Sequence, residues 1–254
     1  MDKNSGNGKD LYNKFSAIAF AGMLFAVLAC VAAMLAGFGS RIGFWHFRTG
    51  FEVLRGSGFL ALLAVIMSVA GAVICLKQKR KGFMLAITGL VPGLILIVLL
   101  VQVWLKTHDV PPIHDITTDF VNPPQFVAIV PLRRDAPNPA AYGGAETAIK
   151  QLQAYPDIKP LVLEQPFEQA FEAARATARR MGWYIVAMDK KDGRIEATAT
   201  TFWFGFIDDI VIRITPAGLR SIIDIRSVSR VGRSDLGANA GRIRIFLVKL
   251  RHNV

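Results

Sequence analysis

The chain has 254 residues, of which 52% are hydrophobic and 19% charged, whereas an ordinary soluble domain carries about 25% charged residues. Residues 1–105 contain 10 basic residues (Lys or Arg) and 3 acidic residues (Asp or Glu). Residues 106–254 contain 20 basic and 16 acidic residues. This division excludes a single soluble globule, and the hydrophobic content excludes an intrinsically disordered chain. The two cysteines, Cys30 and Cys75, lie at different depths of the apolar part, so a disulfide-stapled domain is excluded as well.

Three long segments of the first part lack charged residues and predict three transmembrane helices. The spans are placed at about residues 15–38, 57–76 and 83–105. Each is long enough for a bilayer core of about 30 Å, and inside a bilayer only a helix satisfies its own backbone polar groups. Small residues recur every four positions in the first two spans, at Ala29, Ala33 and Gly37 and at Ala64, Ser68 and Ala72. Such stripes favour close helix packing, so we expect a three-helix bundle within one chain.

The basic residues beside the spans predict the orientation. Seven Lys and Arg precede the first span or lie between the second and third: Lys3, Lys9, Lys14, Lys77, Lys79, Arg80 and Lys81. Only three lie between the first and second: Arg41, Arg48 and Arg55. The positive-inside rule therefore places the amino terminus in the cytoplasm and residues 106–254 outside it. The net charge of +11 is concentrated in the first part, where it sets topology, and indicates no nucleic-acid partner.

Residues 106–156 are predicted to form a proline-rich extended wrap. Ten of the twelve prolines fall between Pro111 and Pro166, which is too many for helices or central strands. The segment nevertheless contains many large apolar residues, among them Phe120 and Phe126, so it is expected to be ordered against the domain or the membrane surface. A short helix is expected near Ala145–Gln153.

Residues 157–254 predict an α+β domain with an antiparallel sheet and a C-terminal helix. The expected strands are Leu161–Glu164, Trp183–Met188, Arg194–Thr201, Phe206–Ile214 and Leu219–Ser229. Between the first two, a helix opened by Pro166 carries an apolar face of Phe167, Ala170, Phe171, Ala174, Ala178 and Met181. A final helix is expected from about Asp235 to Arg251, capped by Ser234. Four consecutive strands between two helices form an α+β layer.

The last two strands are predicted to form a hairpin through the four-residue turn Thr215–Gly218. In this register Ile214 pairs with Leu219, and Asp209 then lies opposite Asp224. Two opposed carboxylates repel each other and need cations or a shared proton. The neighbouring arginines favour an Arg–Asp network that stiffens the sheet.

A catalytic site is the weaker hypothesis for these carboxylates. It would combine Asp208, Asp209 or Asp224 with His114, which lies in the segment His114–Asp119. Adjacent residues seldom converge on one point, and Thr/Asp repeats favour a structural turn there. The sequence has no nucleophile-elbow Gly-x-Ser-x-Gly and no phosphate loop. We therefore assign no catalytic residue, no metal and no cofactor.

The segment from Arg226 to Asn239 is the candidate for binding an anion or a partner. It runs from the end of a strand into the start of a helix, where free backbone N–H groups attract anions. Its candidate side chains are Arg226, Ser227, Ser229, Arg230, Arg233, Ser234 and Asn239. The alternative is structural: Arg230 and Arg233 pair with acids, and Ser234 or Asp235 caps the helix.

Several blocks of the second part together resemble a known family. They are Pro112–Asp119, Pro123-Pro124, Tyr155-Pro156, Gly182-Trp183, Glu196–Thr198, Trp203–Phe206, Asp208-Asp209 and Arg226–Asn239. The stretch Pro111–Leu250 resembles the bacterial family labelled domain of unknown function 1499, whose membrane-anchored members carry apolar spans ahead of the domain. The resemblance implies an extracytoplasmic envelope protein. It implies no activity, substrate or catalytic residue.

The leading functional hypothesis is a bacterial inner-membrane protein with a periplasmic module that is not an enzyme. The module would bind an anionic lipid, an envelope polymer or an envelope protein. One alternative is an envelope hydrolase or transferase that uses the Asp/His site. Another is a lipid carrier, because a long terminal helix packed on an antiparallel sheet is typical of folds that enclose an apolar cavity.

Overall fold

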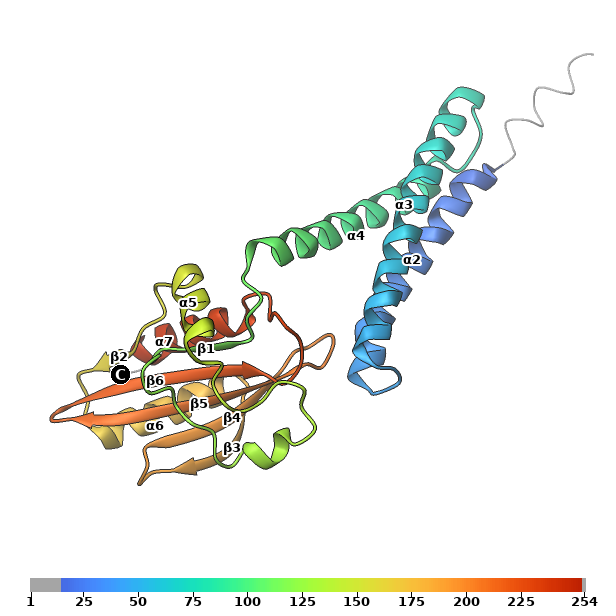
Figure 1. Ribbon diagram of the computed structural model, residues 1–254. Coiled ribbons are helices and arrows are strands. Elements are labelled where there is room, and N and C mark those ends of the chain that lie inside the picture. Colours follow the sequence, from blue (N-terminus) through green and yellow to red (C-terminus); the bar gives the residue numbers. More distant parts are fainter. Residues whose placement is uncertain (1–14, 253–254) are drawn as a thin grey trace, which may run out of the picture. The chain divides into compact units, whose positions relative to one another are not determined.

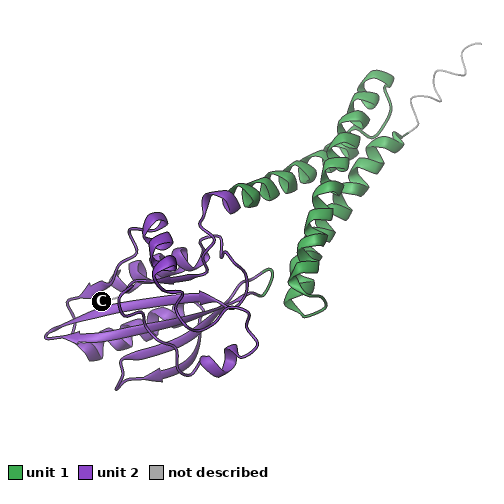
Figure 2. Cartoon of the chain, viewed as in Figure 1, with its two compact units in different colours: residues 1–105, 203–205 green, residues 106–202, 206–254 purple. Residues whose placement is uncertain are grey.

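The computed structural model describes residues 15–252 and divides into two compact units (Figures 1 and 2). Unit 1 comprises residues up to Leu105 together with Trp203–Gly205, and unit 2 comprises the remaining residues from Lys106 onward. Lys3, Lys9 and Lys14, which contribute to the predicted orientation, lie outside the described residues.

Unit 1 is built from three long apolar helices, as predicted. They are α2 (Ala17–Arg41), α3 (Phe47–Gln78) and α4 (Phe83–Asp109). In the described part of the chain these three helices are long and apolar enough to cross a membrane. Helix α3 has 32 residues and begins ten residues before the predicted span, so Arg48 and Arg55 lie on the helix rather than in a loop.

Small residues bring these helices together. All buried residues of α2 and α3 in the described chain are alanine, glycine, serine or cysteine. A Cβ on Gly71 would lie 2.6 Å from the Cα of Ala19, and one on Gly22 would lie 2.5 Å from the Oγ of Ser68. Helix α4 joins at the same level, because a Cβ on Gly89 would lie 2.7 Å from the carbonyl carbon of Gly22. Of the predicted stripes, Ser68 lies in this contact between α2 and α3, whereas a Cβ on Gly37 would meet Trp203.

Unit 2 contains a six-stranded antiparallel sheet. Its elements are β1 (Asp115–Thr117), the 3₁₀ helix η1 (Val130–Arg133), α5 (Gly144–Ala154), β2 (Leu161–Leu163), α6 (Phe167–Arg180), β3 (Tyr184–Asp189), β4 (Arg194–Thr200), β5 (Ile207–Ala217), β6 (Arg220–Ser229) and α7 (Ala238–His252). The strand order is β1-β6-β5-β4-β3, and β2 also pairs with β6. The predicted fold class, apolar helices followed by an antiparallel sheet with a C-terminal helix, is confirmed.

Helices α6 and α7 cover one face of the sheet and enclose the main core (Figure 1). The core side chains include Ile210, Ile212, Ile214, Ile223 and Ile225 from the sheet, Ala170, Phe171, Ala174 and Ala178 from α6, and Ala240, Ile243, Phe246 and Leu250 from α7. Trp183 stacks on Phe246 with ring centroids 5.3 Å apart. The layer between sheet and helices is therefore filled with packed side chains.

The proline-rich segment covers the opposite face of the sheet. Phe126 and Ile129 pack there against Val211 and Val228 in a second, smaller core. The segment is ordered, but it contains β1, η1 and α5 in addition to extended chain. Because this covering is present, polar side chains that point to this face of β5 and β6 are removed from water.

The predicted register of the β5–β6 hairpin is wrong. Ala217 pairs with Arg220 across the two-residue turn Gly218-Leu219, and Asp209 lies opposite Val228 rather than opposite Asp224. Gly218 takes a φ of 67°, a left-handed conformation that a glycine adopts without strain. Pro216 is tolerated in β5 because β4 pairs only as far as Arg213, so the proline lies where β5 has lost one neighbour.

Two local predictions also need correction. The last helix begins at Ala238 instead of Asp235, because Leu236 and Gly237 have positive φ values of 53° and 77° and cannot continue a helix. The segment His114–Asp119 is not only a turn, since Asp115–Thr117 form β1. A strand of three residues is too short to show the alternation of apolar and polar side chains that predicts a strand. Its pairing with β6 is a contact between residues far apart in the sequence, which a local pattern does not show.

Candidate functional site

The two candidate segments of the sequence meet in the structure. Strand β1 pairs with β6, with Asp115 opposite Val228 and Thr117 opposite Arg226. The backbone N–H of Ser229 donates to the carbonyl of His114 at 2.9 Å. Residues about 110 positions apart therefore share one region at the edge of the sheet.

Arg226 and Asp115 form a buried ion pair at the centre of this region. The guanidinium donates to both carboxylate oxygens, at 2.9 Å and 2.8 Å, and its side chain has no exposed area. It also donates to the carbonyls of Pro124 and Ala140. The rings of Phe126 and Tyr142 lie against the guanidinium, at 5.2 and 5.4 Å.

The charge of this pair also affects its surroundings. Burial raises the pKa of Tyr142 to about 12, and the carboxylate of Asp115 contributes to the rise. The phenol is therefore neutral at ordinary pH. The pair itself is satisfied internally and offers no free charge to a ligand.

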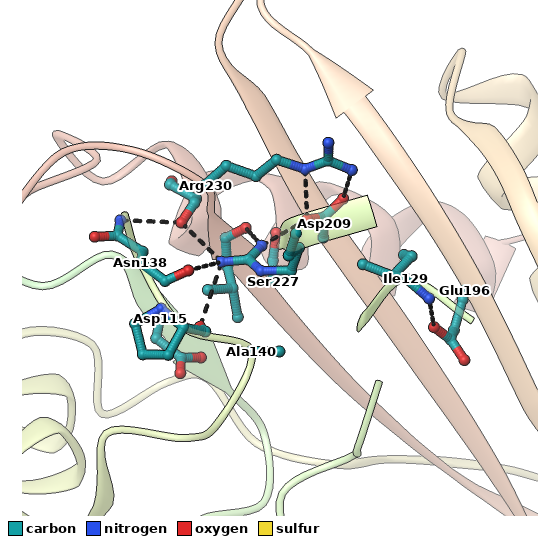
Figure 3. Close-up of polar contacts among 12 residues, drawn as sticks. Asp115, Ile129, Asn138, Ala140, Glu196, Asp209, Ser227 and Arg230 are labelled. Atoms are coloured by element: carbon teal, nitrogen blue, oxygen red, sulfur yellow. Dashed lines mark hydrogen bonds and ion pairs between the residues drawn. The ribbon is translucent and has the colours of Figure 1, made fainter. Parts of the chain in front are cut away.

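Each of the three candidate aspartates is held by arginine. Asp209 accepts from Arg133 at 2.5 Å and from both Nε and Nη2 of Arg230 at 2.9 Å (Figure 3). On the other face of the sheet, Asp208 accepts from Arg242 of α7 at 2.5 Å. The structure thus contains the Arg–Asp network that the sequence favours, built from pairs other than the predicted one.

Asp224 belongs to a third group of this network. It accepts from Arg213, directly opposite on β5, at 2.8 Å and from the hydroxyl of Thr118 at 3.0 Å. The same Arg213 also donates to Asp119. Burial raises the pKa of Asp119, but amide hydrogen bonds from Asn122 and Val121 and the bond from Arg213 outweigh this effect, so the pKa lies below its ordinary value.

The hydroxyl and amide side chains of the basic segment point inward. Ser227, Ser229 and Asn239 are all buried. Asn239 accepts from the hydroxyl of Ser227 at 2.6 Å and donates to Ser229 at 2.9 Å and to the carbonyl of His114 at 3.1 Å. These side chains bind the start of α7 to the sheet.

The chain itself caps the amino terminus of α7. The carboxylate of Asp235 accepts from the N–H groups of Gly237 and Asn239, both at 2.8 Å. Burial raises the pKa of Asp235 above its ordinary value, and the two amide hydrogen bonds oppose that rise. Ser234 instead donates to the carbonyl of Pro111 and accepts from Leu236. The helix start is therefore already occupied by an anionic group.

An open cleft of about 210 Å³ lies beside this network. It is lined by Pro112, Ile113, His114, Asp115, Pro139, Ala141, Gly143, Glu146, Thr147 and Lys150. In the described part of the chain the imidazole of His114 has no hydrogen-bond partner. Lys150 forms a 2.6 Å ion pair with Glu146, which is 80% exposed. In residues 15–252 no group of three or more His, Cys, Asp or Glu side chains could hold a metal ion.

Arg233 is the exposed cation of the basic segment, and it has no ion-pair partner among the described residues. Its loop is joined to the wall of the cleft. Ser234 bonds to Pro111, next to the lining residue Pro112, and Asn138, next to Pro139, donates to the carbonyl of Gly232 at 2.9 Å. The accessible part of the predicted site is therefore Arg233 together with this cleft.

Sequence reasoning missed two residues that organise the region. Glu196 is fully buried and accepts from three consecutive backbone N–H groups, those of Val127, Ala128 and Ile129. Figure 3 shows the bond from Ile129. Arg133 holds Asp209 and donates to carbonyls of the surrounding chain. The alternation Ile195, Glu196, Ala197 places Glu196 away from the main core, but nothing in the strand's own sequence shows that this face is covered.

Comparison with known proteins yields a family but no activity. None of the curated proteins compared matches the chain. A family model described as a protein of unknown function, DUF1499, matches residues 115–250, which is more than half of the chain and all of the sheet from β1 to β6. This range also includes every candidate residue except His114. On this evidence the chain belongs to the DUF1499 family.

Proposed function

We propose that this protein is a membrane-anchored binding module, not an enzyme, whose extramembrane unit binds a small anionic group of an envelope component. The observation that carries the proposal is the cleft of about 210 Å³, which has Lys150 and the unpartnered His114 in its lining. The loop that contains Arg233 is joined to the wall of this cleft by the hydrogen bonds of Ser234 and Asn138. The volume of the cleft is below the 300–1,000 Å³ typical of drug-sized ligands. It therefore suits a phosphate or carboxylate group rather than a whole polymer.

The charges around the cleft support an anionic ligand. Asp115, the most buried acid of the lining, is neutralised by Arg226, so its charge opposes an anion only weakly. Glu146 is largely exposed, and its ion pair with Lys150 can be exchanged for a ligand at little cost. A phosphate or carboxylate that contacts Lys150 and Arg233 would gain charge-assisted hydrogen bonds.

The enzymatic alternative lacks comparable support. Asp208, Asp209 and Asp224 all lie in arginine pairs, which occupy carboxylate oxygens that a general base would use. The lipid-carrier alternative requires open volume between the sheet and α7. Side chains such as Ile243 and Phe246, which are fully buried in that layer, give it no support.

The proposal includes a location. We propose a bacterial inner membrane, with the amino terminus in the cytoplasm and unit 2 in the periplasm, on the basis of the three helices and the seven-to-three distribution of basic residues. A reporter fused after Val254 tests it. Alkaline phosphatase, which is active only outside the cytoplasm, should be active there, and green fluorescent protein should be dark. The reverse result would contradict the proposed topology.

The binding proposal predicts a specific change in affinity. The full chain in phosphatidylcholine nanodiscs should bind inorganic phosphate or glycerol phosphate, measured by calorimetric titration. The double variant Lys150→Gln/Arg233→Gln should bind at least about tenfold more weakly, because it removes two charge-assisted hydrogen bonds. Glu146→Gln should bind more tightly than the wild type, because it removes the competing carboxylate.

Lys191→Gln is the matched control, since Lys191 is exposed at the turn between β3 and β4. It should leave the affinity unchanged. Equal weakening in this control would show a nonspecific charge effect and contradict the assigned site. Failure of the wild-type chain to bind either anion would contradict the proposed function itself.

A further inference from the structure

The membrane unit contains an apolar crevice between α3 and α4. The two helices diverge in Figure 1, and a crevice of about 570 Å³ lies between them. Its walls include Gly58 and Leu62 from α3 and Leu100 and Trp104 from α4, and Arg55 is the only charged side chain in its lining.

The sequence explains why the helices separate there. Near the middle of the spans they contact closely through glycine, since a Cβ on Gly93 would lie 3.3 Å from the carbonyl oxygen of Ala61. Two turns further along α4, the residue that faces α3 is the large Leu100. Leu100 packs against α3 at Gly58, where a Cβ would lie 3.1 Å from the Leu100 side chain, so a large side chain instead of a glycine sets the separation of the two helices there. The crevice is thus a wedge that opens away from the glycine contact.

The wedge has a polar end. Arg55 precedes the apolar part of α3, and Trp104 lies near the end of the apolar part of α4, where tryptophan is typical of a membrane–water interface. Arg55 pairs with Glu52 at 3.2 Å, but the two side chains are 68% and 64% exposed. Such an exposed pair is weak, so the guanidinium is available to another anion.

We propose that this crevice binds one acyl chain of an anionic phospholipid, with the lipid phosphate on Arg55. The apolar lining opens on the helix surface that would face bilayer hydrocarbon, so a lipid chain is the occupant that removes the void without exposing a polar group. The single cation at the interfacial end favours a negatively charged headgroup. This site lies in unit 1 and is independent of the cleft proposed for unit 2.

Lipid retention tests the proposal on the full chain. The protein is reconstituted in nanodiscs with equal phosphatidylglycerol and phosphatidylcholine, extracted into mild detergent, and examined by native mass spectrometry for bound lipid. The wild type should retain phosphatidylglycerol over phosphatidylcholine by roughly fivefold, the preference expected for one basic residue near a membrane surface. Arg55→Gln should abolish the preference. Gly58→Leu, which fills the crevice, should reduce retention of both lipids.

Two controls separate the site from general effects. Arg48→Gln removes another exposed arginine of α3 that does not line the crevice, and Leu63→Phe enlarges a residue of α3 outside it. Both should behave as the wild type. An unchanged preference in Arg55→Gln, or equal loss in Arg48→Gln, would overturn the proposal. Because Arg55→Gln alters no packing in the crevice, this test holds even if Gly58→Leu fails to fold, and neither result bears on phosphate binding by unit 2.

Discussion

Replacing Arg226 with alanine should destabilise unit 2 by about 3–5 kcal/mol, the cost of leaving one partner of a buried ion pair alone. Arg226 has no exposed area, and its partner Asp115 is 4% exposed. Removal of the guanidinium would leave the Asp115 carboxylate buried without its ion-pair partner. The carbonyls of Pro124 and Ala140 would lose their donor. Because water cannot easily reach these groups, no solvent contact replaces the lost bonds.

Urea unfolding of the full chain in detergent measures this effect. Trp183 is a suitable probe, because it is buried against Phe246, and the other tryptophans can be replaced by phenylalanine to isolate its fluorescence. The midpoint should shift to lower urea at an unchanged slope, which indicates a change of stability rather than of compactness.

Arg220→Ala provides the matched control. Arg220 lies on the same strand and pairs with Glu164 at 2.8 Å, but the two side chains are 61% and 70% exposed. Its loss should cost at most about 1 kcal/mol. If Arg226→Ala cost no more than this control, the pair would not hold the proline-rich segment on the sheet.

The double variant Asp115→Asn/Arg226→Met should recover part of the stability lost in Arg226→Ala, because it removes both charges.

The layout of the chain could be predicted from sequence because it depends on local patterns. A run of apolar residues long enough to span a bilayer is a property of the run itself. The apolar face of α6, from Phe167 to Met181 at the helix end, likewise repeats at helical spacing within fifteen residues. Both predictions needed no knowledge of what the elements contact.

The hairpin register failed for a physical reason. The predicted four-residue turn, Thr215–Gly218, contains Pro216, and proline is unfavourable inside a central strand. In the structure β5 extends past its neighbour β4, so Pro216 occupies an edge position that the sequence of the hairpin does not reveal. The pairing moved by an even number of residues, so the face of each side chain remained as predicted.

The candidate site depended on contacts that no local pattern shows. Arg226 and Arg233 are both arginines in one basic segment, yet one is fully buried and the other exposed. What distinguishes them is the proline-rich segment, which brings Asp115 and Ala140 over Arg226 and leaves Arg233 in its loop. Charge along the sequence therefore does not show which arginines of the segment are buried and which are accessible.

The second large effect is expected at Asp209. Replacing Asp209 with alanine should lower the free energy of unfolding of unit 2 by about 3–5 kcal/mol. Its carboxylate is fully buried and holds two arginines, Arg133 and Arg230, whose side chains are 2% and 19% exposed. Without it, two cations remain close together, and Arg133 cannot turn toward water. Asp209→Ala should therefore be comparable to Arg226→Ala in the same urea measurement.

The two arginines should differ in a way that separates structure from binding. Arg230→Gln should cost only about 1 kcal/mol, because Arg230 is partly exposed and Arg133 continues to neutralise Asp209. Since its guanidinium is occupied by Asp209, Arg230→Gln should also leave phosphate binding unchanged, unlike Lys150→Gln/Arg233→Gln. If Arg230→Gln instead weakened phosphate binding about tenfold without loss of stability, the anion site would lie on the strand end at Arg230, not in the cleft.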